Sequence, residues 1–460
     1  MINSLFFPRN NGQLKFWVLF HVILGILSTI NVFFIIVWFY LVLILGISKI
    51  FTTSLKETKI IYLILLLLYI APFEMVCRMA NTSPFIPFEM GKYISFIFLV
   101  YGLSLLRNID NKGILIVLLL IPGILLGWSK AADYRYIVFN VLGIINLGLG
   151  VAFFGGVVLK KKNLDLNQAL RLLFYPLLIA VIYAFIKTPK YDDISFDLGA
   201  NFDASGGFGS NQVSTAFGLG LFLAFYFWLI GSRLSGFNKI IDFGISIFFL
   251  FQGLLTFSRG GVIGGIIGIL LLIYNQWFLK NNKIIFSRIS KLFLIGIPVI
   301  IFTFLITNEI TGGKLIQRYQ GETAGTLAGA KDKDLNHITT GRLNIYLGDI
   351  ETFLNHPILG VGVNESRYYR NYALGVVAHV ELSRLLAEHG LLGLIIFLYF
   401  IFILAIKMKY LRTEYSILVI LFIIGLYTTF HAATRTFMSP LIMAMACIPI
   451  NSIRKKQIEN

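Results

Sequence analysis

The sequence contains long runs of apolar residues that carry no charge at all, such as Ile60–Ala71 and Ile114–Leu126. Charged residues make up only 13% of the 460-residue chain, about half of their share in soluble domains. In a lipid bilayer only α-helices and closed β-barrels satisfy every backbone hydrogen bond. Barrel strands alternate apolar and polar residues, whereas these runs are continuous. The sequence therefore predicts an all-α membrane protein that crosses the bilayer many times.

A transmembrane helix needs roughly 20 mostly apolar residues. Fourteen segments approach this length, near 16–30, 32–48, 59–76, 92–106, 113–128, 136–159, 168–186, 212–231, 239–257, 260–279, 289–307, 390–406, 415–431 and 437–451. The break at Ser28–Asn31 is weak and the last segment is short, so we expect about 12 to 14 helices. The predicted helices and loops divide the chain into four regions. Residues 1–211 contain helices and an outer loop at 187–211, and residues 212–307 contain further helices. A large loop at 308–389 is followed by the last helices in 390–460.

The basic residues are distributed unequally over the loops on the two sides of the membrane. One side, which includes both termini, holds 23 of the 39 basic residues and 6 of the 22 acidic residues. Its net charge is therefore +17, while the other side, with 16 of each kind, is neutral. Because basic loops stay in the cytoplasm, we expect both termini inside a cytoplasmic membrane and both long loops outside it.

This charge pattern also excludes several classes of function. The sequence pI of about 9.7 comes from short inner loops, which attract anionic lipid rather than nucleic acid. These loops are too short for a nucleotide-binding domain and contain no G-x-x-x-x-G-K-[ST] motif. Cys77 and Cys447 lie in apolar segments and have no metal-ligand spacing. We therefore expect no cofactor and no metal, and a substrate that reaches the outer face in the membrane already activated.

Arg259 stands between two predicted spans with almost no loop, in the sequence Thr256-Phe257-Ser258-Arg259-Gly260-Gly261. A charge at the membrane edge is costly unless it is paired or functional. A guanidinium binds phosphate oxygens in a bidentate manner, and the two glycines would let backbone N–H groups approach the same anion. Arg259 is therefore a candidate anion ligand. The alternative is an arginine that snorkels to the surface and only ends a span.

The loop at 308–389 contains a predicted amphipathic helix. Thr339 and Thr340 are candidate caps, and His356-Pro357 would end the helix before a turn at 360–362. Its apolar residues recur at helical spacing, at Leu343, Tyr346, Leu347, Ile350, Phe353 and Leu354. We expect such a helix to lie along the membrane surface or to cover a cavity.

Other residues of this loop are candidate ligands. Arg342 lies at the expected N-terminus of the helix, where the helix dipole also favours an anion, and Arg318 lies earlier in the loop. The cluster Arg367-Tyr368-Tyr369-Arg370-Asn371-Tyr372 combines aromatic rings with hydrogen-bonding groups, as sugar-binding surfaces do. An aromatic belt at the membrane interface is the alternative interpretation of this cluster.

His379 begins a stretch that ends the large loop. If this stretch is a helix, one face carries His379, Ser383, Leu386 and Gly390. Gly390 and Gly393 would allow close backbone approach at the membrane boundary. His379 is the side chain here that could act as a general base at neutral pH without a large pKa shift. The alternative is a structural histidine.

Taken together, these motifs resemble the O-antigen ligase and polymerase superfamily over residues 210–405. The resemblance rests on Thr256–Gly261, on Gly341-Arg342 with the helix that ends in His356–Gly362, and on Ala378-His379 followed by Gly390-Leu391-Leu392-Gly393. The ligase signature has His, then Asn, Ser or Gln, nine residues and G-x-x-G. Here the spacing is kept, but Val380 replaces the amide or hydroxyl residue.

The resemblance implies a GT-C-type glycosyltransferase that uses neither metal nor ATP. Its donor would be a glycan on undecaprenyl diphosphate, and its acceptor a sugar hydroxyl on lipid A–core or on another lipid-linked glycan. Arg259 and Arg342, with Arg318 as a third candidate, would hold the diphosphate, and His379 would be the catalytic base. His431 and Arg435, between the last two spans, are secondary candidates for the same cavity or a helix-end cap.

The retained spacing favours an O-antigen ligase of lipopolysaccharide biosynthesis in the inner membrane. Val380 favours the alternative, a polymerase that extends lipid-linked repeats. A solute transporter is a third possibility, and it requires ionisable residues deep within spans. Glu74, Arg78, Asp242 and His21 are the candidates for that role.

Overall fold

The computed structural model describes residues 2–130, 133–157, 165–191, 194, 196–230, 233–280, 283–329, 334–371, 374–413 and 415–449, and all regular elements in these ranges are helical. The described residues form two compact units. The first unit lies within Met1–Leu105 and Val158–Leu315, and the second lies within Leu106–Val157 and Ile316–Pro449. The predicted all-α membrane fold is confirmed.

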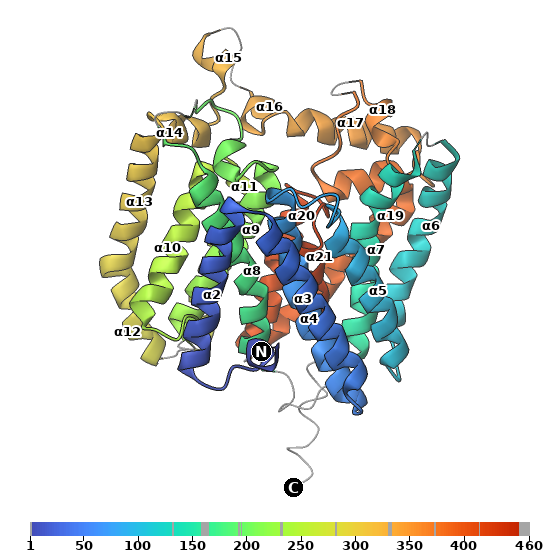
Figure 1. Cartoon of the computed structure of the whole chain (residues 1–460). Helices are drawn as coiled ribbons and strands as arrows, with labels where there is room; N and C mark the ends of the chain where they lie inside the picture. The colour runs from blue at the N-terminus through green and yellow to red at the C-terminus, as the bar shows by residue number, and fades with distance from the viewer. Residues whose placement is uncertain are drawn as a thin grey trace. The chain divides into compact units, whose positions relative to one another are not determined.

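The first unit is built from the N-terminal helices and from those in the middle of the chain (Figure 1). Its helices are α1 (Ile2–Phe6), α2 (Asn11–Ile30), α3 (Phe33–Thr52), α4 (Lys56–Met79), α5 (Met90–Leu105), α8 (Leu166–Lys187), η2 (Asp203–Ser205), α9 (Ser210–Ile230), α10 (Lys239–Leu255), α11 (Arg259–Tyr274), η3 (Asn275–Leu279), α12 (Lys283–Lys291), η4 (Leu292–Gly296) and α13 (Ile297–Ile310). The boundary between the units falls within α14 (Lys314–Tyr319). Helices α4, α8 and α9 are buried along nearly their whole length, whereas α2, α3 and α11 expose an apolar side, as expected for helices that face lipid.

The second unit combines two early helices with the C-terminal part of the chain. Its helices are α6 (Asn111–Lys130), α7 (Tyr134–Gly156), α15 (Ala324–Leu327), α16 (Leu335–Ile338), α17 (Arg342–Asn355), α18 (Ser366–Tyr369), α19 (Glu381–Lys407), η5 (Met408–Arg412), α20 (Ser416–Thr429) and α21 (Met438–Met445). Within this unit α17 runs crosswise to α6, α7 and α19 (Figure 1). The large loop therefore contains the predicted helix as a separate, crosswise element.

Ten helices in the described part of the chain are long and apolar enough to cross a membrane, and two shorter apolar helices, Met90–Leu105 and Ser416–Thr429, accompany them. Each of these twelve coincides with a predicted span. The two remaining predicted spans, 239–257 and 437–451, are the shorter helices α10, with 17 residues, and α21, with 8 residues. Residues 158–159 and 450–451 of the predicted spans lie outside the described ranges.

The prediction of a full last span is wrong for α21. Eight residues of α-helix rise about 12 Å, far less than the roughly 30 Å of the hydrocarbon core. Pro440 lies in the first turn of α21, and Pro449 follows its last residue by four positions. A proline is tolerated in the first turn of a helix, but α21 ends at Met445, so residues 446–449 of this apolar segment are not α-helical.

Helix α19 is interrupted at Gly390, inside the expected signature. Gly390 has φ 62° and ψ −138°, a conformation that only glycine adopts readily. The N–H of Leu391 donates to the carbonyl of Pro357 at 2.7 Å instead of continuing the helix. A Cβ atom at Gly390 would lie 2.5 Å from the same carbonyl oxygen. The interruption therefore creates a docking point for the loop that follows α17.

The same loop satisfies the helix carbonyls that the interruption leaves open. The N–H of Val361 donates to the carbonyl of Ala387 at 2.9 Å, and the N–H of Gly362 donates to that of Glu388 at 3.1 Å. The positive φ angles of Gly360 (70°) and Gly362 (98°) form the predicted turn. Two motifs that are far apart in the sequence thus bond directly to each other.

Candidate functional site

His379 lies in the extended segment that precedes α19, rather than on the helix. Val380 is the N-cap residue with φ −108° and ψ 120°, and the helix begins at Glu381. The prediction that His379, Ser383, Leu386 and Gly390 share a helix face is therefore wrong at both ends, because His379 precedes the helix and Gly390 interrupts it. The turns between them do bury Ser383 and Leu386.

His379 is surrounded by positive charges. Burial, together with the nearby charges of Arg435, Arg342, Arg370 and His431, lowers the pKa of its imidazole to about 3. Its Nδ1 atom is buried and has no hydrogen-bond partner among the described residues. His379 is therefore a neutral imidazole at pH 7 in a cationic environment, with one ring nitrogen uncommitted. Such a group can accept a proton once an anion offsets the surrounding charge.

Three of the predicted site residues are brought to His379 in this unit. Arg342 is the first residue of α17, and His431 and Arg435 lie between α20 and α21. Burial and the charge of Arg342 lower the pKa of His431 to about 3. Burial together with the charges of Arg384 and Arg342 lowers the pKa of Arg435 to about 10. The two cationic residues and two histidines form one electrostatically coupled group.

The segment after α20 fixes the backbone on both sides of His379. The guanidinium of Arg435 donates to the carbonyls of Val377 at 3.3 Å and Ala378 at 3.1 Å. The N–H of Thr434 donates to the carboxylate of Glu381 at 3.0 Å. The imidazole is therefore held between two anchored positions.

The helix predicted in the large loop is confirmed as α17. It begins at Arg342 and ends at Asn355, directly before His356. Its N-cap is Gly341 with φ 80°, while the hydroxyl of Thr339 accepts from the N–H of Leu343 at 3.2 Å. Gly341, rather than Thr339 or Thr340, therefore occupies the N-cap position. Of the two predicted threonines, Thr339 accepts a hydrogen bond from the first turn of the helix.

The apolar face predicted for α17 is not its buried face. Leu347 is 54% exposed and Leu354 is 68% exposed, whereas the buried positions are Ile345, Asp349 and Thr352. The helix thus packs through a mixed face that contains a carboxylate. Its leucines remain available to a lipid surface, and the prediction that α17 lies along the membrane stays a prediction.

Asp349 is the centre of a buried network that the sequence did not reveal. Its carboxylate accepts from Arg370 Nε at 2.7 Å and from the hydroxyl of Ser383 at 2.7 Å. The Asp349 and Arg370 side chains are both fully buried. Burial raises the pKa of Asp349, and the guanidinium of Arg370 and the hydroxyl of Ser383 oppose this effect. The network joins α17, the end of α18 and the start of α19 around the His379 segment.

One detectable signal for this network was a polar residue among apolar neighbours. Asp349 lies two residues after Leu347 and directly before Ile350, within an otherwise amphipathic pattern. A charge at such a position is either at the boundary of the helix face or buried with a partner. The partner, Arg370, is 21 residues away, so no local rule identifies the pair.

The N-cap of α19 provides a direct test of the backbone geometry. Val380 makes no side-chain cap hydrogen bond, so Val380→Asn is expected to stabilise the chain by about 1 kcal/mol. The measurement is the midpoint of thermal unfolding in detergent, which should rise for Val380→Asn and not for Val380→Ala. An unchanged midpoint for Val380→Asn would show that the helix begins elsewhere.

Arg259 is the first residue of α11 and belongs to the first unit. The hydroxyl of its N-cap residue, Ser258, donates to Asn211 Oδ1 at 2.8 Å and lies 2.9 Å from the hydroxyl of Ser214. A Cβ atom at Gly261 would overlap the backbone of Ser214. Gly261 therefore permits close packing of α11 on α9. The role of Arg259 as an anion ligand stays a prediction.

Arg318 is buried on α14 and is not among the cationic groups that act on His379 as described above. Its role as a diphosphate ligand also stays a prediction.

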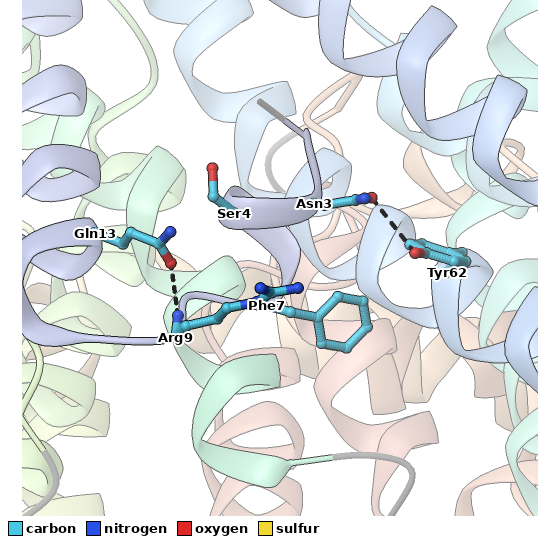
Figure 2. A pocket seen from close by; sticks show the side chains of 6 residues that line it. All are labelled: Asn3, Ser4, Phe7, Arg9, Gln13 and Tyr62. Carbon is cyan, nitrogen blue, oxygen red and sulfur yellow. Dashed lines mark hydrogen bonds between the residues drawn. The ribbon is translucent and has the colours of Figure 1, made fainter.

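A cavity of about 430 Å³ lies in the first unit, lined by Asn3, Ser4, Phe7, Arg9, Gln13 and Tyr62. Figure 2 shows these side chains, with Arg9 hydrogen-bonded to Gln13 and Tyr62 to Asn3. None of the predicted site residues lines this cavity.

Comparison with known families identifies one match. A family model described as O-antigen ligase matches residues 244–398. The matched region includes Arg259, Arg318, Arg342 and His379. No curated protein and no solved structure matches the chain.

Proposed function

We propose that this chain, whose residues 244–398 match a family model described as O-antigen ligase, transfers a glycan from undecaprenyl diphosphate to an acceptor sugar. The preferred acceptor is lipid A–core, which makes the chain an O-antigen ligase of the inner membrane. The reaction takes place on the outer face, without metal or ATP. The observation that carries this proposal is the group of Arg342, Arg435 and His431 around a neutral His379.

The chemistry follows from what these groups can do. His379 accepts the proton of the acceptor hydroxyl as its oxygen attacks the anomeric carbon. The bond between that carbon and the diphosphate oxygen breaks, and the electron pair leaves with the undecaprenyl diphosphate. Arg342 stabilises the charge that develops on the leaving group. The proton and the electron pair are thus both accounted for by groups in the site and by the donor itself.

The donor also activates the base. In the free chain, burial and the arginine charges hold the pKa of His379 near 3, which makes it a weak base. A diphosphate beside Arg342 brings negative charge that offsets the cationic environment and raises this pKa. His379 therefore becomes an effective base when the donor is bound, which limits proton abstraction to the productive complex.

The position of Val380 at the N-cap makes the departure from the ligase signature compatible with the ligase proposal. The signature position after the histidine is the N-cap of α19, and Asn and Ser are favoured N-cap residues. A residue of that type would serve helix capping there. With valine at this position the helix lacks a side-chain cap, and no ligand for the acceptor is lost.

The candidates for a transport pathway are held by structural contacts. Glu74 pairs with Arg78, and Arg78 also contacts Glu89 at 2.9 Å. Asp242 accepts two backbone N–H groups, and the imidazole of His21 lies 2.9 Å from the hydroxyl of Tyr69. These contacts favour the transferase proposal over a transporter.

Reconstitution tests the proposal directly. The purified chain in nanodiscs is given an undecaprenyl-diphosphate-linked glycan with either lipid A–core or a second lipid-linked repeat as the acceptor. A ligase forms product on lipid A–core, and a polymerase forms a longer lipid-linked glycan. Arg342→Gln is expected to slow either reaction by about 100-fold, since one charged ligand of the leaving group is lost. The exposed Arg135→Gln is the matched control, and equal activity of the two variants would contradict the proposal.

The charges around His379 predict how the reaction rate depends on pH and in which direction a variant shifts this dependence. His379 must be neutral to act as a base, and its pKa in the free chain is near 3 rather than near 6.5. The acid limb of kcat/KM, which reports the free enzyme, is therefore expected well below pH 6. Arg435→Gln removes a positive charge and should move this limb to higher pH. A wild-type limb at pH 6.5 that does not move in the variant would contradict the assignment.

A further inference from the structure

The guanidinium of Arg367 lies between two exposed aromatic rings in the second unit. Its carbon is 4.7 Å from the ring centre of Tyr368 and 5.6 Å from that of Tyr136. Tyr136 belongs to α7 and is 51% exposed, and Tyr368 belongs to α18 and is 54% exposed. Two segments that are distant in the sequence thus form one exposed aromatic site with a cation at its centre.

Arg367 differs in its hydrogen bonding from Arg370 and Arg435, two other arginines of this unit. Arg370 binds the carboxylate of Asp349, and Arg435 binds two backbone carbonyls. The Nε atom of Arg367 is buried but has no hydrogen-bond partner among the described residues. A buried donor without a partner is costly, and a ligand with acidic or hydroxyl oxygens would satisfy it.

The surroundings hold this arrangement in place. Lys130 at the end of α6 donates to the hydroxyl of Tyr369 at 3.2 Å and to the carbonyl of Val361 at 3.1 Å. Asn140 on α7 donates to the side chain of Asn364 at 2.8 Å. These bonds tie α6 and α7 to the segment that carries Arg367. The aromatic rings are therefore positioned before any ligand binds, which lowers the entropic cost of binding.

We propose that Tyr136, Arg367 and Tyr368 bind the acceptor saccharide through an acidic group, an inference that rests on the proposed transferase function. Tyrosine rings present a rigid apolar face with a polar tip, which suits the C–H faces and hydroxyls of a sugar. The planar guanidinium matches a carboxylate or phosphate in a bidentate manner. Tyr372, also part of the predicted cluster, lies outside the described residues.

The position of Arg367 relative to the site supports an acceptor role. Arg370 follows Arg367 by three residues, and its charge acts on the imidazole of His379. The Trp128 and Tyr134 rings stack at 4.5 Å at the facing ends of α6 and α7 and are about half exposed. They offer a second aromatic surface for a longer glycan. A belt residue that only contacts lipid would not require the central guanidinium.

Binding of defined oligosaccharides tests the site. The full chain in nanodiscs is titrated by calorimetry with a galacturonate hexamer, which is acidic, and with maltoheptaose, which is neutral. The acidic probe is expected to bind more tightly, and Arg367→Gln should weaken its binding by about tenfold. Tyr136→Ala and Tyr368→Ala should weaken it by about fivefold, while Tyr368→Phe retains the ring and the affinity. Phe85→Ala, which removes an exposed ring in the first unit, is the control.

The outcomes separate this inference from the proposed function. Arg367→Gln is expected to raise KM for the acceptor about tenfold and to leave KM for the donor unchanged. If Arg342→Gln impairs turnover but Arg367→Gln changes neither probe binding nor the acceptor KM, the acceptor site is wrong and the transferase stands. Equal binding of both probes would overturn the acidic recognition. Weaker copurification of phosphatidylglycerol with Arg367→Gln, together with unchanged binding of the acidic probe, would identify a lipid site instead.

Discussion

His379→Gln is expected to lower the rate constant of glycan transfer by about 100- to 10,000-fold, the range for loss of a general base. Glutamine keeps a polar side chain of similar reach, but its amide accepts no proton at neutral pH. Arg342 remains in place, so the affinity for the lipid-diphosphate donor should change little. Single-turnover kinetics with saturating donor measure the chemical step separately from binding.

The matched control for this variant is His356→Gln. His356 is an exposed histidine directly after α17, whose ring meets that of Tyr369 edge-on. Its replacement should leave the rate within about twofold, as for most surface substitutions. Full activity of His379→Gln would remove the catalytic base from the proposal. Equal losses in both variants would point to a general defect in folding rather than to chemistry.

Asp349→Ala is expected to destabilise the chain by about 3–5 kcal/mol, the cost of leaving one member of a buried ion pair without its partner. The side chains of Asp349 and Arg370 are both fully buried and lie 2.7 Å apart. The hydroxyl of Ser383 would lose its acceptor as well. Detergent-solubilised protein titrated with sodium dodecyl sulfate reports the free energy of unfolding of each variant.

The double variant Asp349→Leu/Arg370→Met distinguishes the ion pair from simple loss of packing. Replacing both members of a buried pair by apolar residues is often neutral or stabilising. The double variant should therefore be more stable than Asp349→Ala, and its deficit should reflect the lost bonds to Ser383 and Ser366. A double variant that is less stable than the single one would show that the charges themselves stabilise the fold.

The membrane helices can be predicted from hydropathy because the bilayer imposes one dominant rule: each spanning segment is a continuous apolar helix. Twelve of the predicted spans coincide with the apolar helices of the described chain. The rule fails at α21, where only eight of the described residues of an apolar segment are α-helical. Composition alone does not distinguish a short buried helix from a span.

The site was only partly accessible from the sequence. The helix from Arg342 to Asn355 follows from its periodicity and its flanking residues. The position of His379 before α19, rather than on it, depends on Arg435, which binds the carbonyls of residues 377 and 378 from 58 and 57 residues away. Contacts at such a separation are set by tertiary packing, which no local pattern encodes.

The interruption at Gly390 shows that the histidine and the glycines of the signature have different roles. The glycine receives the loop through the carbonyl of Pro357, and the loop in turn occupies the carbonyls of Ala387 and Glu388. The position of Gly390 in the signature is therefore set by packing, because the loop after α17 binds where α19 is interrupted. Proteins that keep the glycines and lack the histidine are therefore expected to share this architecture, whereas the proposed transfer reaction requires the imidazole.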